Sequence, residues 1–83
     1  MKMSFTVYIL ECRDGTLYAG YTTDIQKRLH QHNNLKTGAR YTSGRRPVKL
    51  VHKETFKTLR KAKQREYRIK QLPRAKKLQL INA

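Results

Sequence analysis

Glu66 has the setting that most strongly suggests chemistry. It falls four positions after Ala62 and three before Ile69, near the middle of an apolar stripe spaced for a helix. A carboxylate buried there without a partner costs several kcal/mol, so it must be ion-paired, protonated or bound to a metal. An ion pair with one of the neighbouring arginines is the ordinary solution, and the sequence supports it as well as it supports a metal site.

Two tyrosines lie on a β-hairpin predicted over residues 5–22. β-Forming residues precede and follow the turn signal Arg13-Asp14-Gly15, with Tyr8 on the first strand and Tyr18 on the second. If the loop has two residues, the tyrosines point to opposite faces of the sheet. Strands favour tyrosine in any case, so the spacing of these phenols is by itself weak support for a site.

The other register, which we prefer, places both phenols on one face. It needs a three-residue loop with Gly15 in the left-handed conformation. Leu10 then pairs with Tyr18, and Tyr8 pairs with Gly20. Because Gly20 has no side chain, it leaves a notch beside Tyr8 through which a ligand or a backbone can approach.

Arg28 and His32 form a third group. They lie four residues apart on the helix predicted after the hairpin, so they are side by side along its edge. Ile25 and Leu29 mark the buried stripe of this helix. Arg28 and His32 border that stripe, and we expect them to project toward the face of the hairpin.

A loop rich in donors is predicted from Leu35 to Pro47. Its amides and cations suit phosphate oxygens. Tyr41 can stack on a base or anchor the loop, and the two roles are equally well supported. The candidate nucleic-acid contacts are Gly20, Lys36, Arg40, Tyr41, Thr42, Arg45 and Arg46.

The remaining elements complete an α+β fold of the order β-β-α-β-α-α, a small three-stranded antiparallel sheet flanked by helices. The expected elements are the hairpin, a helix from Thr23 or Asp24 to about Asn33-Asn34, a strand over 48–56, a helix over about 58–72 and a short helix from Pro73. Leu50 and Val51 should cover opposite faces of the third strand. Ala75, Leu78 and Ile81 should close the core.

The charge of the chain favours a polyanionic partner. Twenty Lys and Arg against five Asp and Glu leave a formal net charge of +15. The cations run from Lys27 to Lys77 through segments of predicted structure, which is typical of nucleic-acid binding. A membrane surface is disfavoured because no long amphipathic helix carries a broad aromatic face.

Length and cysteine content set further limits. The 83 residues are expected to form a single domain over 1–83. Cys12 is the only cysteine, which excludes an intramolecular disulfide and a cysteine-based zinc site. We see no signal-peptide core and no long apolar run, so we expect a cytoplasmic protein.

Taken in order, these residues resemble the GIY-YIG nuclease domain, and in particular its short stand-alone bacterial members. The matching segments are Thr6-Val7-Tyr8, Tyr18-Ala19-Gly20, Arg28, His32, Glu66 and the run from Tyr41 to Pro47. Thr6 replaces the glycine of the first motif, and Ala19 replaces the isoleucine of the second. Neither position supplies a side chain to the chemistry. We expect no counterpart in this chain of the separate substrate-selecting domain that larger members carry.

The resemblance implies a metal-dependent phosphodiesterase. Glu66 would hold one divalent cation, usually Mg²⁺, and Arg28 would contact the scissile phosphate. Tyr8 and Tyr18 would line the site, one of them helping to activate the attacking water, and His32 would be an accessory group. A lone carboxylate is a sparse ligand set, so such a metal should bind weakly without substrate.

The identity of the base stays open between the two tyrosines. A free phenol, with a pKa of ~10, is a poor base at neutral pH. Nearby cations such as Arg28 should favour the phenolate. We favour Tyr8 because the preferred register sets it beside Gly20.

Three functions compete. The first is an endonuclease acting on DNA, at branched, nicked or single-stranded sites. The second is a non-catalytic module that binds DNA or RNA through the same basic face. The third, a basic protein of a ribonucleoprotein particle, leaves Tyr8, Tyr18, Arg28 and Glu66 without a role. Only the first predicts that Glu66 matters for activity and not for affinity. DNA is preferred over RNA as the partner, and the residues do not indicate an oligomeric state.

Overall fold

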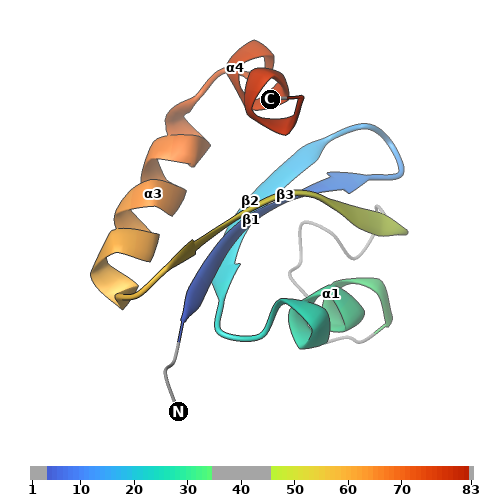
Figure 1. Cartoon of the computed structure of the whole chain (residues 1–83). Helices are drawn as coiled ribbons and strands as arrows, with labels where there is room; N and C mark the ends of the chain where they lie inside the picture. Colours follow the sequence, from blue (N-terminus) through green and yellow to red (C-terminus); the bar gives the residue numbers. More distant parts are fainter. Residues whose placement is uncertain (1–3, 35–45, 83) are drawn as a thin grey trace.

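The computed structural model describes residues 4–34 and 46–82. Over these residues the chain forms, in order, β1 (Phe5–Cys12), β2 (Leu17–Thr22), α1 (Ile25–Asn34), β3 (Val48–Phe56), α3 (Leu59–Gln71) and α4 (Arg74–Ile81) (Figure 1). The strands form one antiparallel sheet in the order β2-β1-β3. The predicted α+β class and the order β-β-α-β-α-α are confirmed.

The hairpin adopts the preferred register. Tyr8 is opposite Gly20, and Leu10 is opposite Tyr18. Gly15 has φ 84° in the loop, a left-handed conformation that glycine adopts without strain. Tyr8 and Tyr18 therefore share one face of the sheet.

The central strand β1 is buried on both faces, and α1 and α3 lie on opposite sides of the sheet (Figure 1). Alternation along β1 divides the core into two clusters. The cluster on the α3 side consists of Val7, Ile9, Ala19, Ala62 and Ile69. The cluster on the α1 side consists of Tyr8, Leu10, Cys12 and Val48, with Tyr18, Ile25, Leu29 and Leu50 packed against it.

The third strand has the predicted bounds and contains a register shift. Ile9 pairs with His52, but Leu10 pairs with Leu50, so Val51 is the extra residue of a bulge. Leu50 packs in the α1-side cluster and Val51 in the α3-side cluster. The prediction that these two residues cover opposite faces is confirmed.

Side-chain caps determine where two helices begin. Asp24 Oδ1 accepts from the amide of Lys27 at 3.1 Å, so Asp24, not Thr23, caps α1. Thr58 Oγ1 accepts from the amide of Lys61 at 3.2 Å and caps α3. No helix in the described part of the chain is long and apolar enough to span a membrane.

The final helix agrees with expectation in part, because Ile81 packs on the core as predicted and Leu78 is half-buried. Ala75 is exposed, and the residues that pack against the α3-side cluster are Leu80 and Ile81. The prediction for Ala75 is wrong because α4 packs through the side that carries Leu80 and Ile81, and at about 100° per residue Ala75 lies on a different side of the helix.

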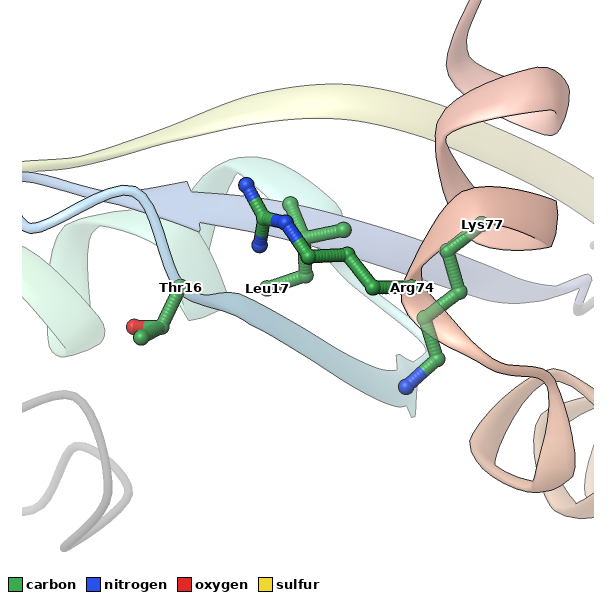
Figure 2. A pocket seen from close by; sticks show the side chains of 4 residues that line it. All are labelled: Thr16, Leu17, Arg74 and Lys77. Carbon is green, nitrogen blue, oxygen red and sulfur yellow. The ribbon is translucent and has the colours of Figure 1, made fainter.

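The start of α4 is tied to the hairpin turn. Arg74 Nη1 donates to the carbonyl of Gly15 at 2.8 Å. Figure 2 shows the guanidinium of Arg74 reaching toward the β1–β2 turn, over a hollow of about 190 Å³ lined by Thr16, Leu17, Arg74 and Lys77. This contact joins the start of α4 to the β1–β2 turn.

Candidate functional site

A buried cluster of three rings lies between the sheet and α1. Tyr8 is 1% exposed and His32 is fully buried. Tyr8 Oη and His32 Nε2 are 3.1 Å apart and form a hydrogen bond. The Tyr18 ring meets the His32 ring edge-on, with centroids 5.3 Å apart. Three predicted site residues from β1, β2 and α1 therefore touch one another.

Gly20 makes room for this cluster. A Cβ at Gly20 would lie 2.6 Å from Tyr8 Oη, 2.8 Å from Tyr8 Cζ and 3.4 Å from Tyr18 Cε1. The Tyr8 phenol thus occupies the space that we expected to admit a ligand. The absence of a side chain at Gly20 allows the Tyr8 ring to pack there. A nucleic-acid contact at Gly20 stays a prediction.

Arg28 stands between the ring cluster and the surface. It is partly buried, and its Nη1 donates to Gln31 Oε1 at 3.1 Å. It also hydrogen-bonds with the side chain of Tyr8. On its outer side it lines a hollow of about 370 Å³, whose other lining residues are Thr22, Thr23, Asp24, Lys27 and Gln31. A phosphate that enters this hollow would therefore meet a guanidinium that also contacts Tyr8.

Several of the predicted site residues influence the ionisation of Tyr8. Burial is the largest influence and raises the pKa of Tyr8; the neighbouring Tyr18 and Glu66 raise it further. Arg28 lowers it through its hydrogen bond and its charge. The net result is a pKa above the ordinary value. Arg28 therefore favours the phenolate, as we expected, but burial outweighs the cation, and the hydroxyl of Tyr8 stays protonated at neutral pH.

His32 is held in its neutral form. Burial, followed by the charges of Arg28 and Arg46, lowers the pKa of His32 to about 4. Arg46 lies close because its Nε donates to the carbonyl of His32 at 2.5 Å. At neutral pH the imidazole is uncharged, so its Nε2 can accept the hydrogen bond of the protonated Tyr8 hydroxyl.

Glu66 on α3 is largely buried, as the stripe predicted. Its side chain is 18% exposed, and its Oε1 lies 3.6 Å from Nζ of Lys70, whose side chain is 50% exposed. The sequence suggested an arginine partner, but the ion pair that the structure contains is with a lysine one turn further along α3. A partly exposed helix pair four residues apart, as here, contributes about 0.3–0.5 kcal/mol.

The donor set at Glu66 is compatible with a magnesium ion. The described residues contain no group of three or more His, Cys, Asp or Glu that could hold a metal together. Mg²⁺ retains several waters and is often bound by one or two carboxylates together with substrate oxygens. Because the Lys70 contact is long and half-exposed, the Glu66 carboxylate can serve as that oxygen ligand.

The predicted nucleic-acid contacts are divided by the described range. Lys36, Arg40, Tyr41, Thr42 and Arg45 lie outside the described residues. Arg46 lies inside it, and it contacts the last turn of α1 through the carbonyls of His32 and Gln31. In the structure Arg46 therefore positions the helix that carries Arg28 and His32.

Asn33 is a positioning residue that the sequence did not reveal. Its Nδ2 donates to the carbonyl of Val48 at 3.0 Å, and its Oδ1 accepts from the amide of Val48 at 2.7 Å. The amide side chain thus pairs with β3 as a neighbouring strand would. We interpreted the asparagine pair as a helix end, which is correct but does not predict this contact.

Comparison with known proteins gives a consistent result. The family model described as the GIY-YIG catalytic domain matches residues 4–79. A UPF0213 protein of Syntrophus aciditrophicus is 59% identical over 75 residues, which cover 90% of this chain and 86% of that protein. A UPF0213 protein of Halobacterium salinarum is 58% identical over 71 residues, which cover 86% of this chain and 91% of that protein.

Two solution NMR structures have a similar fold. The UPF0213 protein of Bacillus halodurans aligns with a TM-score of 0.63 at 46% identity, over 96% of this chain and 84% of that one. A protein of E. faecalis aligns with a TM-score of 0.68 at 43% identity, over 98% of this chain and 85% of that one. The topology found here therefore matches that of homologous solved structures.

Proposed function

The chain belongs to the GIY-YIG family, and on that premise we propose that it is a metal-dependent endonuclease that hydrolyses phosphodiester bonds in DNA. One observation supports this most directly. Tyr18, Arg28 and Glu66, which come from three different elements, all act on the ionisation of Tyr8. Perturbed titratable groups that converge at one place are typical of catalytic sites.

Arg28 is suited to bind the scissile phosphate. Phosphodiester hydrolysis adds negative charge to the phosphate oxygens in the transition state, and a preorganised guanidinium stabilises that charge. The hydrogen bond to Gln31 and the contact with Tyr8 hold the guanidinium beside the hollow. Arg28 therefore meets the phosphate without rearranging.

Tyr8 and His32 can move a proton together. Because the pKa of Tyr8 is raised, Tyr8 alone is a poor base. Its hydroxyl lies 3.1 Å from Nε2 of the neutral His32. As Tyr8 takes a proton from the attacking water, its own proton passes to His32, and no phenolate needs to exist beforehand. An anionic phosphate nearby would raise the pKa of His32 and favour this transfer.

Glu66 would hold the divalent cation, Mg²⁺ or a similar ion. When bound, that ion supplies charge stabilisation to the phosphate oxygens. The side chain of Glu66 supplies one oxygen ligand, and substrate is needed to complete the set. Magnesium affinity should therefore be weak in the free protein and higher with DNA present.

A non-catalytic DNA- or RNA-binding module is the second candidate. The observation that favours it is the closure of the ring cluster, in which Tyr8 and His32 are buried and bonded to each other. Both functions predict binding that weakens with salt, since neutralising phosphates releases counterions. Cleavage separates them.

The test is cleavage of labelled single-stranded, duplex, nicked and branched DNA and of one RNA, with Mg²⁺ or with EDTA. We expect wild type to cut only with Mg²⁺, and Glu66→Gln to bind without cutting. Glu54→Gln is the matched control, because it removes a carboxylate that is bonded to Arg65. Folding of each variant is checked by circular dichroism. Tight binding by wild type with no cutting of any substrate would favour the binding module.

A further inference from the structure

The outer side of α3 carries an exposed aromatic ring among cations. Tyr67 is 65% exposed, more than any other large hydrophobic residue in the described part of the chain. It lines an open hollow of about 390 Å³ together with Lys63, Gln64 and Arg68. We call these four residues the Tyr67 platform. Exposing a tyrosine ring to water brings no packing energy, so the platform is a candidate contact surface.

The charge of the platform is not balanced by neighbouring acids. Glu66 is the only acidic residue of α3; it is 18% exposed and paired with Lys70. Within the described residues, no side chain forms an ion pair with Lys63 or Arg68. Like charges on one helix side repel each other until an anionic partner neutralises them.

The basic surface continues beyond the platform toward the sheet. A second hollow, of about 340 Å³, shares Gln64 and Arg68 with the first and is also lined by Phe56, Lys61 and Arg65. Cations therefore follow α3 on both sides of Tyr67. This arrangement suits a chain of phosphates more than a single small anion.

We propose that the Tyr67 platform binds single-stranded nucleic acid, with one unpaired base stacked on the Tyr67 ring and flanking phosphates on Lys63 and Arg68. Aromatic rings flanked by cations are the usual contacts of proteins that bind single strands. Gln64 carries an amide that can hydrogen-bond the edge of the stacked base. A duplex offers no free base face, so it gains only the charge contacts.

This inference rests on the proposed function, because it assigns the platform to the substrate of the Glu66 site. Tyr67 follows Glu66 directly, and successive residues of a helix are rotated by about 100°. A strand that leaves the site around α3 therefore meets the platform next. The substrate class that follows is DNA with an unpaired segment beside the cut.

The hollow at the start of α4 is a weaker candidate. It also contains two cations, Arg74 and Lys77 (Figure 2). However, Arg74 already donates to the Gly15 carbonyl, and the Thr16 hydroxyl donates to Asp14 at 2.6 Å. Two of its polar groups are thus engaged inside the protein, and no aromatic ring lines it.

The experiment uses fluorescence. The chain contains no tryptophan, so Tyr67→Trp introduces a single reporter at the platform. Combined with Glu66→Gln, which prevents cutting, this variant is titrated with oligo-dT, oligo-U and a duplex of equal length at fixed salt. We expect oligo-dT and oligo-U to quench the emission on binding, because stacking does not depend on the sugar. The duplex should bind with little quenching.

Affinities then separate stacking from charge. In the Glu66→Gln background, Tyr67→Ala should weaken oligo-dT binding about 5- to 100-fold and duplex binding less than about twofold. Tyr67→Phe should keep the affinity of the parent. Leu59→Ala, which alters a 40% exposed side chain on the same helix outside both hollows, is the control.

The outcomes distinguish this inference from the proposed function. Unchanged oligo-dT affinity in Tyr67→Ala would overturn the platform, and so would equal losses for single strand and duplex. If wild type cuts no substrate but Tyr67→Ala still loses oligo-dT binding, the platform stands and the nuclease proposal fails. If wild type cuts DNA, and Tyr67→Ala binds and cuts as well as wild type, the platform is wrong and the nuclease proposal stands.

Discussion

The two faces of β1 are equally buried but differ in chemistry. On the α3 side, Val7 and Ile9 pack against Ala62 and Ile69, and the cluster contains no polar group. On the α1 side, Tyr8 packs as a core residue, but its hydroxyl bonds with His32. Burial alone therefore does not mark the site. What distinguishes the candidate site is that its buried polar atoms form hydrogen bonds with each other, as Tyr8 and His32 do.

This difference separates two kinds of sensitivity. Packing in the α3-side cluster depends on volume, so an apolar replacement of similar size should cost stability and leave the chemistry unchanged. The α1-side cluster depends on directional bonds, so a change of a single atom should cost activity more than stability. Paired variants, one on each face, test this contrast.

The largest effect should come from Tyr8→Phe, with Ile9→Val as its partner on the other face. Tyr8→Phe would remove the proposed proton relay and should lower the cleavage rate by about 10²–10⁴-fold. The unpaired Nε2 of His32 should cost about 1–2 kcal/mol in free energy of unfolding. Ile9→Val should cost about 1 kcal/mol and keep full activity per folded molecule.

Cleavage rates and urea unfolding of both variants measure this pair. If Tyr8→Phe cleaves DNA at the same rate as wild type, Tyr8 takes no part in the proton transfer, and Tyr18 is left as the candidate base. A large loss of activity in Ile9→Val would mean that the two faces are not independent.

Gly20→Ala should have the next largest effect. The added Cβ meets the Tyr8 hydroxyl at 2.6 Å, and the buried, bonded ring has little freedom to move. We expect a loss of about 1–3 kcal/mol in stability, with cleavage lowered at least about 10-fold as Tyr8 moves from His32. A chemical-shift change at the His32 ring would report that displacement.

Gly15→Ala is the control for the Gly20 variant. It strains the left-handed turn at φ 84°, but an added Cβ meets nothing within 4 Å. It should cost about 1–2 kcal/mol, with unchanged activity per folded molecule. Equal activity losses at both glycines would contradict the assignment of Gly20 to Tyr8.

Elements with a local signal were predictable from the sequence. The turn at Gly15 determines the hairpin register, because left-handed backbone there selects the three-residue loop. The bounds of α3 follow from the Thr58 cap and from Pro73. Ala75 failed as a core residue because the direction of a short helix after a proline depends on the sheet it packs on.

The proximity of the candidate site residues was predictable from the sequence, but their energetics were not. Tyr8, His32 and Arg28 meet as expected, since strand pairing and helix spacing bring them together. Arg28 lowers the pKa of Tyr8 as predicted, but the net upward shift was not predicted, because it depends on how completely α1 covers the ring. The Lys70 partner of Glu66 was not predicted, because charge alone does not distinguish a lysine one turn along α3 from the nearby arginines.

The third prediction concerns pH. The pKa of His32 is lowered to about 4 in the folded protein, so the unfolded chain takes up the proton first as the pH falls. The stability from the neutral imidazole is present above the unfolded pKa, about 6.5, and should fall by roughly 3 kcal/mol by pH 4. Urea unfolding of wild type and His32→Gln between pH 7.5 and 4 should show a steep slope only in wild type.

The smallest effect is expected from Glu54→Gln, which alters the polar cluster on the α3 side. Burial alone would raise the pKa of Glu54, but hydrogen bonds from Arg65 and His52 outweigh it and hold the pKa below its ordinary value. Arg65 donates to both carboxylate oxygens at 3.0–3.1 Å, and His52 Nε2 lies 2.8 Å from Oε2. The hydrogen bonds of Glu54 are as short as the one between Tyr8 and His32, but they lie on the α3 side of the sheet.

Glu54→Gln should therefore lower stability by about 1 kcal/mol at neutral pH, because the partly exposed pair is screened by solvent. A carboxylate with a depressed pKa stabilises the fold above its unfolded pKa and stops doing so as the pH falls through the folded value. The difference between wild type and Glu54→Gln should thus shrink as the pH falls below the unfolded pKa and disappear below the lowered folded pKa, and it should also shrink in high salt. Cleavage at pH 7 should be unchanged. If Glu54→Gln instead lost activity while folded, hydrogen bonding on the α3 side would also position the site, and the contrast between the two faces of β1 would have to be abandoned.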